Sequence, residues 1–288
     1  MTRLFGLAVL ALFLLVPAGA SAQLLAAKDG PIVYGHHHLS AANVDAAKKF
    51  WTEVLGGTLA RVGTGTTEVV KIPNALIFFA ARPATGGSKG TTFDHIGLSV
   101  PNLRAVLDKV KAAGFKVVTT AEAPPNVKVV DDIGVVDAGG VTGIGYVLGP
   151  DEVKIELVEM KAQKEPVANH HLHFFGEKQA EMQAWYVKTF GAQNRPAPNP
   201  TMMSAGLPGL GMNFSQSAGP VVGTRGRAVD HIGFEVKNLE AFMKSLEGGG
   251  VKIDRPYTKV DALGIAIAFI TDPWGTYIEL TEGLDRVP

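Results

Sequence analysis

Histidine and glutamate are the residue types whose placement points most directly to chemistry in this chain. Four histidines occupy the same position in four segments of similar sequence: His36, His95, His171 and His231. Glu156 and Glu279 follow in matching "IEL" contexts. Imidazole nitrogens combined with a carboxylate are common ligands of divalent transition metals. Because the chain has no cysteine, thiolate sites are excluded, and any such metal must be held by nitrogen and oxygen ligands.

The histidines mark an internal repeat. The segment "HHHLSAANVDAAKKFWTEVLGG" is echoed by "HLHFFGEKQAEMQAWYVKTFGA", and "FDHIGLSVPNLRAVLDKVKAAG" by "VDHIGFEVKNLEAFMKSLEGGG". The two pairs also align with each other, because His36 precedes Asn43 by the same spacing that separates His95 from Asn102. Histidine is retained in all four copies while its neighbours vary, which favours a chemical role over packing.

Each repeat predicts a strand that begins near its histidine, then an amphipathic helix, then three further strands. Apolar residues recur at helical spacing, for example at Val44, Ala47, Phe50 and Val54, and each helix runs into glycine. Stretches rich in β-formers, such as "TEVVKI" and "ALIFFAA", follow the helices. The sequence therefore predicts an α+β fold of four βαβββ modules, with a long loop at residues 121–140 of the second module.

Strand geometry selects among the remaining histidines. Side chains alternate between the two faces of a strand, so His38 is expected on the face of His36, and His173 on the face of His171. Two residues from a predicted ligand, His38 and His173 are candidates for acid or base catalysis, or for a further ligand.

The same alternation orients the glutamates and separates the other histidines. A glutamate between Ile and Leu on a terminal strand faces away from them, toward whatever the sheet encloses, which applies to Glu156 and Glu279. His37 and His170 have no facing argument and are expected to have no role in the site.

The βαβββ units, the "DHIGLSV" starts and the "DPWGTYIEL" ending resemble the vicinal oxygen chelate superfamily, which includes glyoxalases, bleomycin-resistance proteins and extradiol dioxygenases. The resemblance implies two tandem domains with cupped mixed sheets, at residues 31–161 and 169–284, joined by a linker at 162–168. Each domain would hold a divalent metal. The metal ligands implied by position are His36, His95 and Glu156 in the first domain and His171, His231 and Glu279 in the second. Pairing of module one with four and two with three remains an alternative, and it would exchange members between the triads.

The resemblance also implies a range of chemistries. Glyoxalases draw a further ligand from the last strand of the first module, but "ALIFFAA" and "LGMNFSQ" offer no carboxylate, and only Asn213 or Gln216 could substitute. Two histidines and one carboxylate are typical of non-haem Fe(II) oxygenases, so Fe(II) is the first expectation, with Mn, Zn or Ni able to use the same ligands. Tyr146 stands where extradiol dioxygenases carry a catalytic tyrosine, whereas the second domain has Phe269.

The expected function is therefore a metal-dependent dioxygenase, lyase or isomerase that acts on a small oxygen-chelating molecule. The alternative is a glyoxalase- or bleomycin-resistance-like protein that binds a small molecule without turnover, although such binders commonly lack the metal ligands. A third possibility is that one domain is catalytic and the other structural. The sequence identifies neither the substrate, the residues that contact it, nor the oligomeric state.

The N-terminus and the charge balance set the expected surroundings. Arg3, a short apolar run and the small residues Ala20-Ser21-Ala22 predict a signal peptide at residues 1–22, and hence a periplasmic or secreted protein without a membrane segment after cleavage. Equal numbers of basic and acidic residues (27 each), without a basic stripe, make nucleic acid an unexpected partner.

Overall fold

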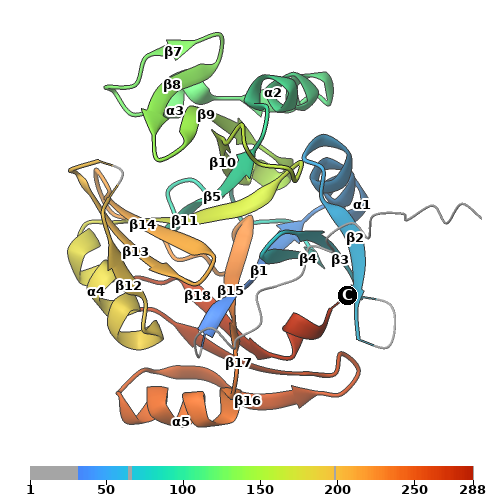
Figure 1. Ribbon diagram of the computed structural model, residues 1–288. Coiled ribbons are helices and arrows are strands. Elements are labelled where there is room, and N and C mark those ends of the chain that lie inside the picture. Colours follow the sequence, from blue (N-terminus) through green and yellow to red (C-terminus); the bar gives the residue numbers. More distant parts are fainter. Residues whose placement is uncertain (1–31, 64–66, 198, 288) are drawn as a thin grey trace, which may run out of the picture.

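The four repeats form four modules that each begin with a strand and a helix (Figure 1). The computed structural model describes residues 32–63, 67–197 and 199–287, so the predicted signal peptide lies outside the described residues. Module one comprises β1 (Ile32–Ala41), α1 (Val44–Lys49), the π-helical turn η1 (Phe50–Val54), β2 (Thr58–Val62), β3 (Thr67–Ile72) and β4 (Ala75–Ala81). Module three comprises β11 (Ala168–Gly176), α4 (Gln179–Phe190), β12 (Gln193–Arg195), β13 (Met202–Leu207) and β14 (Leu210–Gln216).

The other two modules follow the same plan. Module two comprises β5 (Phe93–Val100), α2 (Leu103–Ala112), β6 (Lys116–Val117), α3 (Thr119–Glu122), β7 (Val129–Val130), β8 (Ile133–Ala138), β9 (Val141–Leu148), η2 (Pro150–Glu152) and β10 (Lys154–Glu159). Module four comprises β15 (Val229–Val236), α5 (Leu239–Gly248), β16 (Ile253–Val260), β17 (Ile265–Thr271), β18 (Tyr277–Glu282) and η3 (Leu284–Arg286). The predicted α+β fold of βαβββ repeats is confirmed.

The modules pair across the chain to form two mixed sheets. Modules four and one make the sheet β16-β17-β18-β15-β1-β4-β3-β2, and modules three and two make the sheet β12-β13-β14-β11-β5-β10-β9-β8-β7, with β6 beside β9. In each sheet the first strands of the two modules pair antiparallel, β1 with β15 and β11 with β5. The prediction that modules one and two share a sheet is therefore wrong, and the alternative pairing is the one observed.

Two crossover segments account for this pairing. Residues 82–92 carry the chain from the first sheet to the second, and residues 217–228 carry it back. They run side by side and exchange backbone hydrogen bonds, including Thr92 N–H to the Val222 carbonyl (2.9 Å) and Ala228 N–H to the Gly86 carbonyl (2.9 Å). The two segments thereby pair backbone N–H and C=O groups that a buried connection would otherwise leave without hydrogen bonds.

The helices begin where the repeated asparagines lie. The side chains of Asn43, Asn102 and Asn238 each accept a hydrogen bond from the N–H three residues ahead, which satisfies a free donor at the helix start. At the C-terminus of α4, Gly191 adopts a left-handed conformation (φ 68°), which costs little for a residue without a side chain. The helices lie at the periphery of the molecule, outside the two sheets (Figure 1).

Alternation along the last strands separates the two faces of each sheet. Ile155 and Leu157 of β10 belong to the large apolar core, whereas Val158 belongs to a separate small cluster on the opposite face. Glu156 lies between the first two and shares the face of Val158, as the sequence predicts. Each sheet thus turns its glutamate away from the main core.

Residues 121–140, predicted as a loop, contain the hairpin β7–β8 at the edge of the second sheet. Asp131 (φ 48°) and Asp132 (φ 65°) form its two-residue turn, a conformation that aspartate tolerates better than most residues. The hairpin places Val127 and Val136 against the apolar cluster that contains Tyr146.

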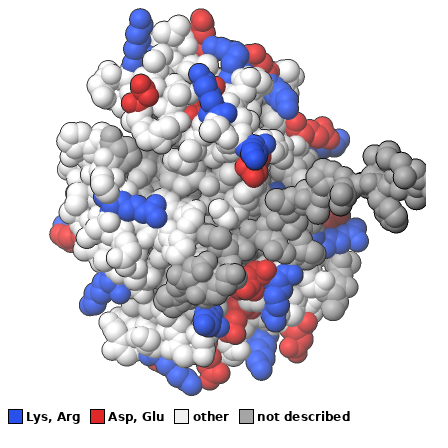
Figure 2. Space-filling model, in the orientation of Figure 1, with Lys and Arg blue, Asp and Glu red and all other residues white. Residues whose placement is uncertain are grey.

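Two further features of the structure are the distribution of charge on its surface and the length of its helices. Figure 2 shows basic and acidic residues interspersed over the face in view, among many uncharged residues, as expected from equal charge numbers. Among residues 32–63, 67–197 and 199–287, no helix combines the length and apolarity needed to cross a bilayer.

Candidate metal centres

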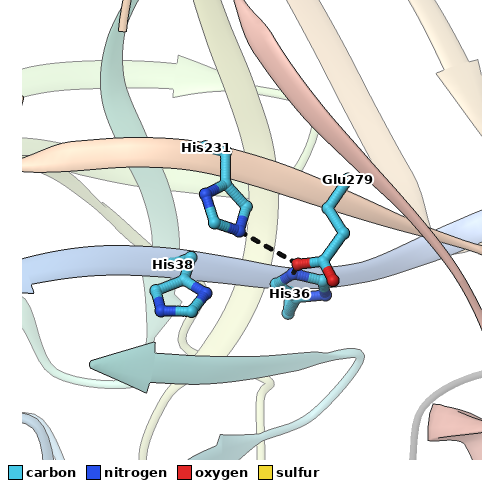
Figure 3. Close-up of side chains that lie close together, drawn as sticks. All are labelled: His36, His38, His231 and Glu279. Atoms are coloured by element: carbon cyan, nitrogen blue, oxygen red, sulfur yellow. Dashed lines mark hydrogen bonds and ion pairs between the residues drawn. The ribbon is translucent and has the colours of Figure 1, made fainter. Parts of the chain in front are cut away.

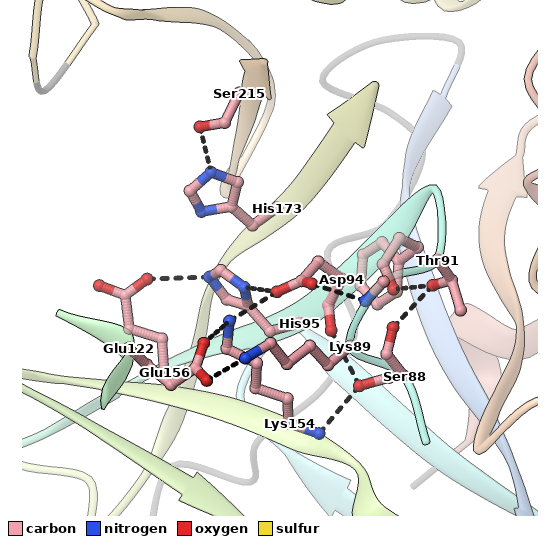
Figure 4. Close-up of polar contacts among 12 residues, drawn as sticks. Ser88, Lys89, Thr91, Asp94, His95, Glu122, Lys154, Glu156, His173 and Ser215 are labelled. Atoms are coloured by element: carbon pink, nitrogen blue, oxygen red, sulfur yellow. Dashed lines mark hydrogen bonds and ion pairs between the residues drawn. The ribbon is translucent and has the colours of Figure 1, made fainter. Parts of the chain in front are cut away.

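Two groups of histidine and glutamate side chains lie close together, one in each sheet. The outer centre, from modules one and four, contains His36, His38, His231 and Glu279 (Figure 3). The inner centre, from modules two and three, contains His95, Glu156, His171 and His173. Figure 4 labels three of them, His95, Glu156 and His173. In each group one potential ligand atom per residue lies within 4.8 Å of every other.

The six predicted metal ligands therefore gather in groups that differ from the predicted triads. His36 lies with His231 and Glu279, and not with His95 and Glu156. The strand register is the reason. β1 pairs with β15, which sets His38 opposite His231, and β15 pairs with β18, which sets Gly233 beside Glu279. The inner centre repeats this register on β11, β5 and β10.

In the outer centre, two imidazoles converge on one carboxylate oxygen. Nε2 of His36 lies 2.9 Å from Oε2 of Glu279, and Nε2 of His231 lies 3.0 Å from the same atom. His38 points to the same cluster from β1, with its ring 4.4 Å from that of His231. Glu279 and His231 are buried, whereas His38 is partly exposed. The outer centre therefore reaches the surface at His38.

The inner centre repeats this convergence in a fully buried setting. Nε2 of His95 lies 3.0 Å from Oε2 of Glu156, and Nε2 of His171 lies 3.2 Å from it. The ring of His173 lies 4.4 Å from that of His95, and its Nε2 is hydrogen-bonded to the Ser215 hydroxyl at 2.9 Å. All four members are buried.

A glycine makes room for the first histidine of each centre. A Cβ atom on Gly233 would lie well under 3.0 Å from the ring of His36, closer than real Cβ atoms come to a neighbour, and a Cβ on Gly97 would meet the ring of His171 in the same way. The glycine of the repeated "DHIG" sequence thus admits the imidazole from the paired module. This close approach is what the glycine provides, since neither residue has an unusual φ.

The aspartate of the same "DHIG" sequence holds the histidine that follows it, His95 or His231. Nδ1 of His95 is hydrogen-bonded to Asp94 Oδ1 at 2.8 Å, and Nδ1 of His231 to Asp230 Oδ1 at 2.6 Å. Such a bond fixes the tautomer of the ring and leaves Nε2 free to face a metal. The prediction from sequence missed both aspartates, although their repetition beside the histidine was visible.

Each aspartate is in turn fixed by a cation and a backbone donor. Lys154 Nζ lies 2.8 Å from Asp94 and 2.7 Å from Glu122, and this buried lysine joins the network drawn in Figure 4. Asp230 instead accepts from the guanidinium of Arg82 at 2.5 Å, and the N–H of Gly226 donates to it at 2.6 Å. The side chain of Arg82 is half exposed, so the outer anchor is open to water and the inner one is not.

In both centres the electrostatics favour a positive charge between the aspartate and the glutamate carboxylates. Burial alone would raise the pKa of Glu156, but His171 and His95 hold it well below its usual range. Burial alone would lower the pKa of His95, but Asp94 and Glu156 raise it. His231 responds in the same way to Asp230 and Glu279.

The second histidine of each first strand behaves differently. Burial, together with the neighbouring imidazoles, lowers the pKa of His38 to about 3 and that of His173 well below its usual range. Both rings are therefore neutral near pH 7, which is the form that can ligate a metal or accept a proton.

Three other residues test the assignments made from sequence. Tyr146 lies opposite Glu156 in the register of β9 and β10, with its ring 5.8 Å from that of His95, and burial raises its pKa. His37 is buried away from the clusters, and its Nδ1 is hydrogen-bonded to the Tyr34 hydroxyl at 2.7 Å. His170, expected to have no role, contacts the inner centre through a 2.8 Å bond between its Nδ1 and that of His171.

The donor set fits a divalent transition metal. Three imidazoles and one carboxylate per centre supply nitrogen and oxygen ligands of the kind that Fe, Mn, Zn and Ni accept. Among the described residues, Nδ1 of His36 and Nδ1 of His173 are buried without a hydrogen-bond partner, and Nε2 of His171 lies 3.2 Å from Glu156 without forming a hydrogen bond. His37 and Asn169, outside the centres, also carry unpaired atoms, so the fit to a metal rests on the donor set and its convergence.

Comparison with known proteins agrees with the fold and the repeat. The sequence model of the Glyoxalase/Bleomycin resistance protein/Dioxygenase superfamily matches residues 33–157 and again residues 126–280. A probable lactoylglutathione lyase from Vibrio parahaemolyticus is 33% identical over 140 residues, which cover 44% of this chain and 89% of the lyase.

Solved structures resemble the chain over most of its length. Glyoxalase I from Zea mays superposes with a TM-score of 0.64 at 16% identity, covering 88% of this chain and 94% of the maize protein. A putative dioxygenase from Bacillus subtilis superposes with a TM-score of 0.63 at 12% identity, covering 87% and 84% of the two chains. At these identities the structures establish the fold alone. The two sequence matches span nearly all of the described chain, and it therefore belongs to the glyoxalase/bleomycin resistance/dioxygenase superfamily.

Proposed function

We propose that this protein is an exported, divalent-metal-dependent enzyme that acts on a small molecule with two vicinal oxygens. The observation that carries the proposal is the convergence of two imidazole Nε2 atoms on one carboxylate oxygen, within 2.9–3.2 Å, in each of two centres. A metal held there would act as a Lewis acid toward chelated oxygens.

Dioxygenase chemistry is the first candidate, because two histidines and one glutamate are typical of non-haem Fe(II) oxygenases. The strand that supplies a further glutamate in glyoxalases carries Phe78 beside His38, and Asn213 beside His173. Neither side chain is a carboxylate. A lyase or isomerase is the second candidate, favoured by the sequence similarity to proteins named lactoylglutathione lyases.

The chain's own residues would divide the remaining work. His36, His231 and Glu279 would hold the outer metal, and Asp230 would keep the His231 ring in position. His38, neutral and partly exposed, is placed to accept a proton from a bound hydroxyl. In the inner centre His173 takes the same place, and the Tyr146 hydroxyl, which stays protonated because burial raises its pKa, can donate a hydrogen bond to a substrate oxygen.

Export follows from the predicted signal peptide at residues 1–22 and would place the small-molecule substrate in the periplasm or outside the cell. Fractionation of cells that express the full chain tests this part. We expect mature protein in the periplasmic or culture fraction with an N-terminus near Gln23. Retention in the cytoplasm at full length contradicts it.

The test of activity compares the wild type with a double variant, Glu156→Gln/Glu279→Gln, that keeps shape and removes both carboxylates. Anaerobically purified protein is reconstituted with Fe(II), Mn, Zn or Ni, and assayed for O₂ uptake with catechol and for breakdown of lactoylglutathione. We expect turnover that depends on the metal and is lost in the double variant. If neither protein binds metal and both bind small chelators equally, the proposal fails and binding without turnover is the better account.

A further inference from the structure

We infer that the two metal centres bind different classes of oxygen-chelating ligand: the outer centre an aromatic chelator, and the inner centre a polar, hydrogen-bonding one. This inference rests on the proposed function, because it requires both centres to hold a metal. It goes beyond that function because it assigns a separate ligand preference to each centre.

Strand register identifies the equivalent positions around the two centres. Three positions surround each cluster: the residue beside His38 or His173 on the neighbouring strand, the residue opposite the glutamate, and the residue two positions before the glutamate. In the outer centre these positions hold Phe78, Phe269 and Tyr277, and in the inner centre they hold Asn213, Tyr146 and Lys154. Three aromatic rings in one centre correspond to an amide, a phenol and an ammonium group in the other.

The aromatic residues of the outer centre contact its imidazoles directly. The ring of Phe78 lies 5.0 Å from that of His36, and the rings of Phe269 and Tyr277 lie 5.4 Å and 5.5 Å from that of His231. All three contacts are edge-on, the arrangement that aromatic pairs prefer. A ligand bound to these imidazoles would therefore meet ring faces and edges on several sides.

This aromatic wall is fixed before any ligand arrives. Phe269 and Tyr277 stack at 5.0 Å, and the guanidinium of Arg225 lies 3.8 Å above the Tyr277 ring. The apolar surface continues through Ile267 and Leu284, which belong to the same cluster as Phe78 and Phe269. Aromatic ligands gain most where the wall is apolar and already ordered, because little side-chain freedom remains to be lost on binding.

The inner centre presents more polar groups, beside two aromatic rings, Tyr146 and Phe175. Phe175 stacks on His173 with ring centroids 5.0 Å apart, at the position that Ser40 holds in the outer centre. The Ser215 hydroxyl bonds His173, whereas the equivalent position on β4 is Ala80. Lys154 is held between Asp94 and Glu122, and its ammonium lies 5.4 Å from the Tyr146 ring. A polar ligand could pair with the Tyr146 hydroxyl and the Asn213 amide, whereas a purely aromatic group would cover them without pairing them, which disfavours it.

The two centres also differ in their exposure to solvent. The outer centre is partly exposed at His38, whereas all four members of the inner centre are buried. The larger, aromatic ligand therefore has the more open of the two centres.

The test uses hydroxamates, which bind metals through two vicinal oxygens, and cobalt(II), whose visible spectrum reports ligand binding. Two single-centre proteins are prepared: His171→Ala/Glu156→Ala, which keeps the outer centre, and His36→Ala/Glu279→Ala, which keeps the inner one. Each is loaded with cobalt and titrated with benzohydroxamate and with acetohydroxamate. We expect the outer centre to prefer the aromatic hydroxamate by about tenfold more than the inner centre does.

Exchange of the residues at one equivalent position, Phe78 and Asn213, provides the matched control. Phe78→Asn should lower the aromatic preference of the outer centre, and Asn213→Phe should raise that of the inner centre. Tyr146→Phe serves if Asn213→Phe does not fold, and thermal unfolding of each variant confirms folding. Cobalt binding with equal preference at both centres overturns this inference and leaves the proposed function standing. If neither single-centre protein binds cobalt, both the proposed function and this inference fail.

Discussion

Gly233→Ala offers a sharp test of how the outer centre is assembled, because the substitution adds one methyl group where the His36 ring lies. The added Cβ would fall well under 3.0 Å from that ring, whereas ordinary van der Waals contact begins at 3.4 Å. The ring must therefore retreat by on the order of 1 Å, since the Cβ is fixed to the backbone of the central strand β15. Metal–ligand distances tolerate only about 0.2 Å of deviation.

Two consequences follow from this displacement. Overpacking of a buried site costs about 1–3 kcal/mol of folding free energy. Loss of correct orientation of one ligand lowers metal affinity by at least about 10–100-fold. We therefore expect Gly233→Ala to fold with a modest loss of stability, and to bind cobalt at the inner centre alone.

The assay is a cobalt titration of the purified full chain, followed by thermal unfolding of the apo protein. Gly97→Ala is the matched variant and should affect the inner centre alone. Gly248→Ala, at the end of α5 with no atom within 4 Å of the added Cβ, is the neutral control. Two cobalt ions bound by Gly233→Ala with wild-type affinity would refute the reasoning, as would the loss of both.

Three further predictions concern the groups behind the centres. Asp230→Asn and Asp94→Asn should each lower cobalt affinity about 10–100-fold at their own centre only, because the histidine loses the acceptor that fixes its tautomer; unchanged affinity in a cobalt titration would exclude a positioning role. Lys154→Met should cost about 3 kcal/mol in urea unfolding, because it leaves the buried carboxylate of Asp94 without its cation, whereas Arg82→Met at the half-exposed anchor should cost under about 1 kcal/mol. Equal costs would contradict the difference in burial. Burial lowers the pKa of His37 to about 3, so below pH 6.5 the unfolded chain binds a proton that the folded chain does not, and the free energy of unfolding falls as the pH drops. Between pH 8 and pH 5, His37→Gln should therefore lose about 2 kcal/mol less of this free energy than the wild type does. Equal losses would show that His37 does not titrate on unfolding.

The sequence was sufficient to predict the modules and the residues that gather in the centres. Repeated histidines, the "IEL" glutamates and the strand alternation place each of these side chains on the correct face, because a period of two residues leaves only one choice. The asparagines that recur seven residues after a histidine proved to be helix caps in three of the modules.

The pairing of modules could not be derived from the repeat, because four similar modules can pair in more than one way with the same local pattern. Contact across the chain decides it, through the two crossover segments and the antiparallel pairing of β1 with β15. Gly97 and Gly233 carried a signal, since a glycine in the middle of a buried strand indicates close approach by another group. The hairpin at residues 121–140 escaped prediction because its strand β7 has only two residues.

The most direct test of this account is metal content per chain in two double variants that remove one histidine and one glutamate each. Module pairing across the chain predicts that His36→Ala/Glu279→Ala damages the outer centre alone and keeps about half of the wild-type metal. It predicts that His36→Ala/Glu156→Ala damages both centres and loses nearly all of it. The opposite result, with half retained by His36→Ala/Glu156→Ala and none by His36→Ala/Glu279→Ala, would contradict the assignment of ligands to centres.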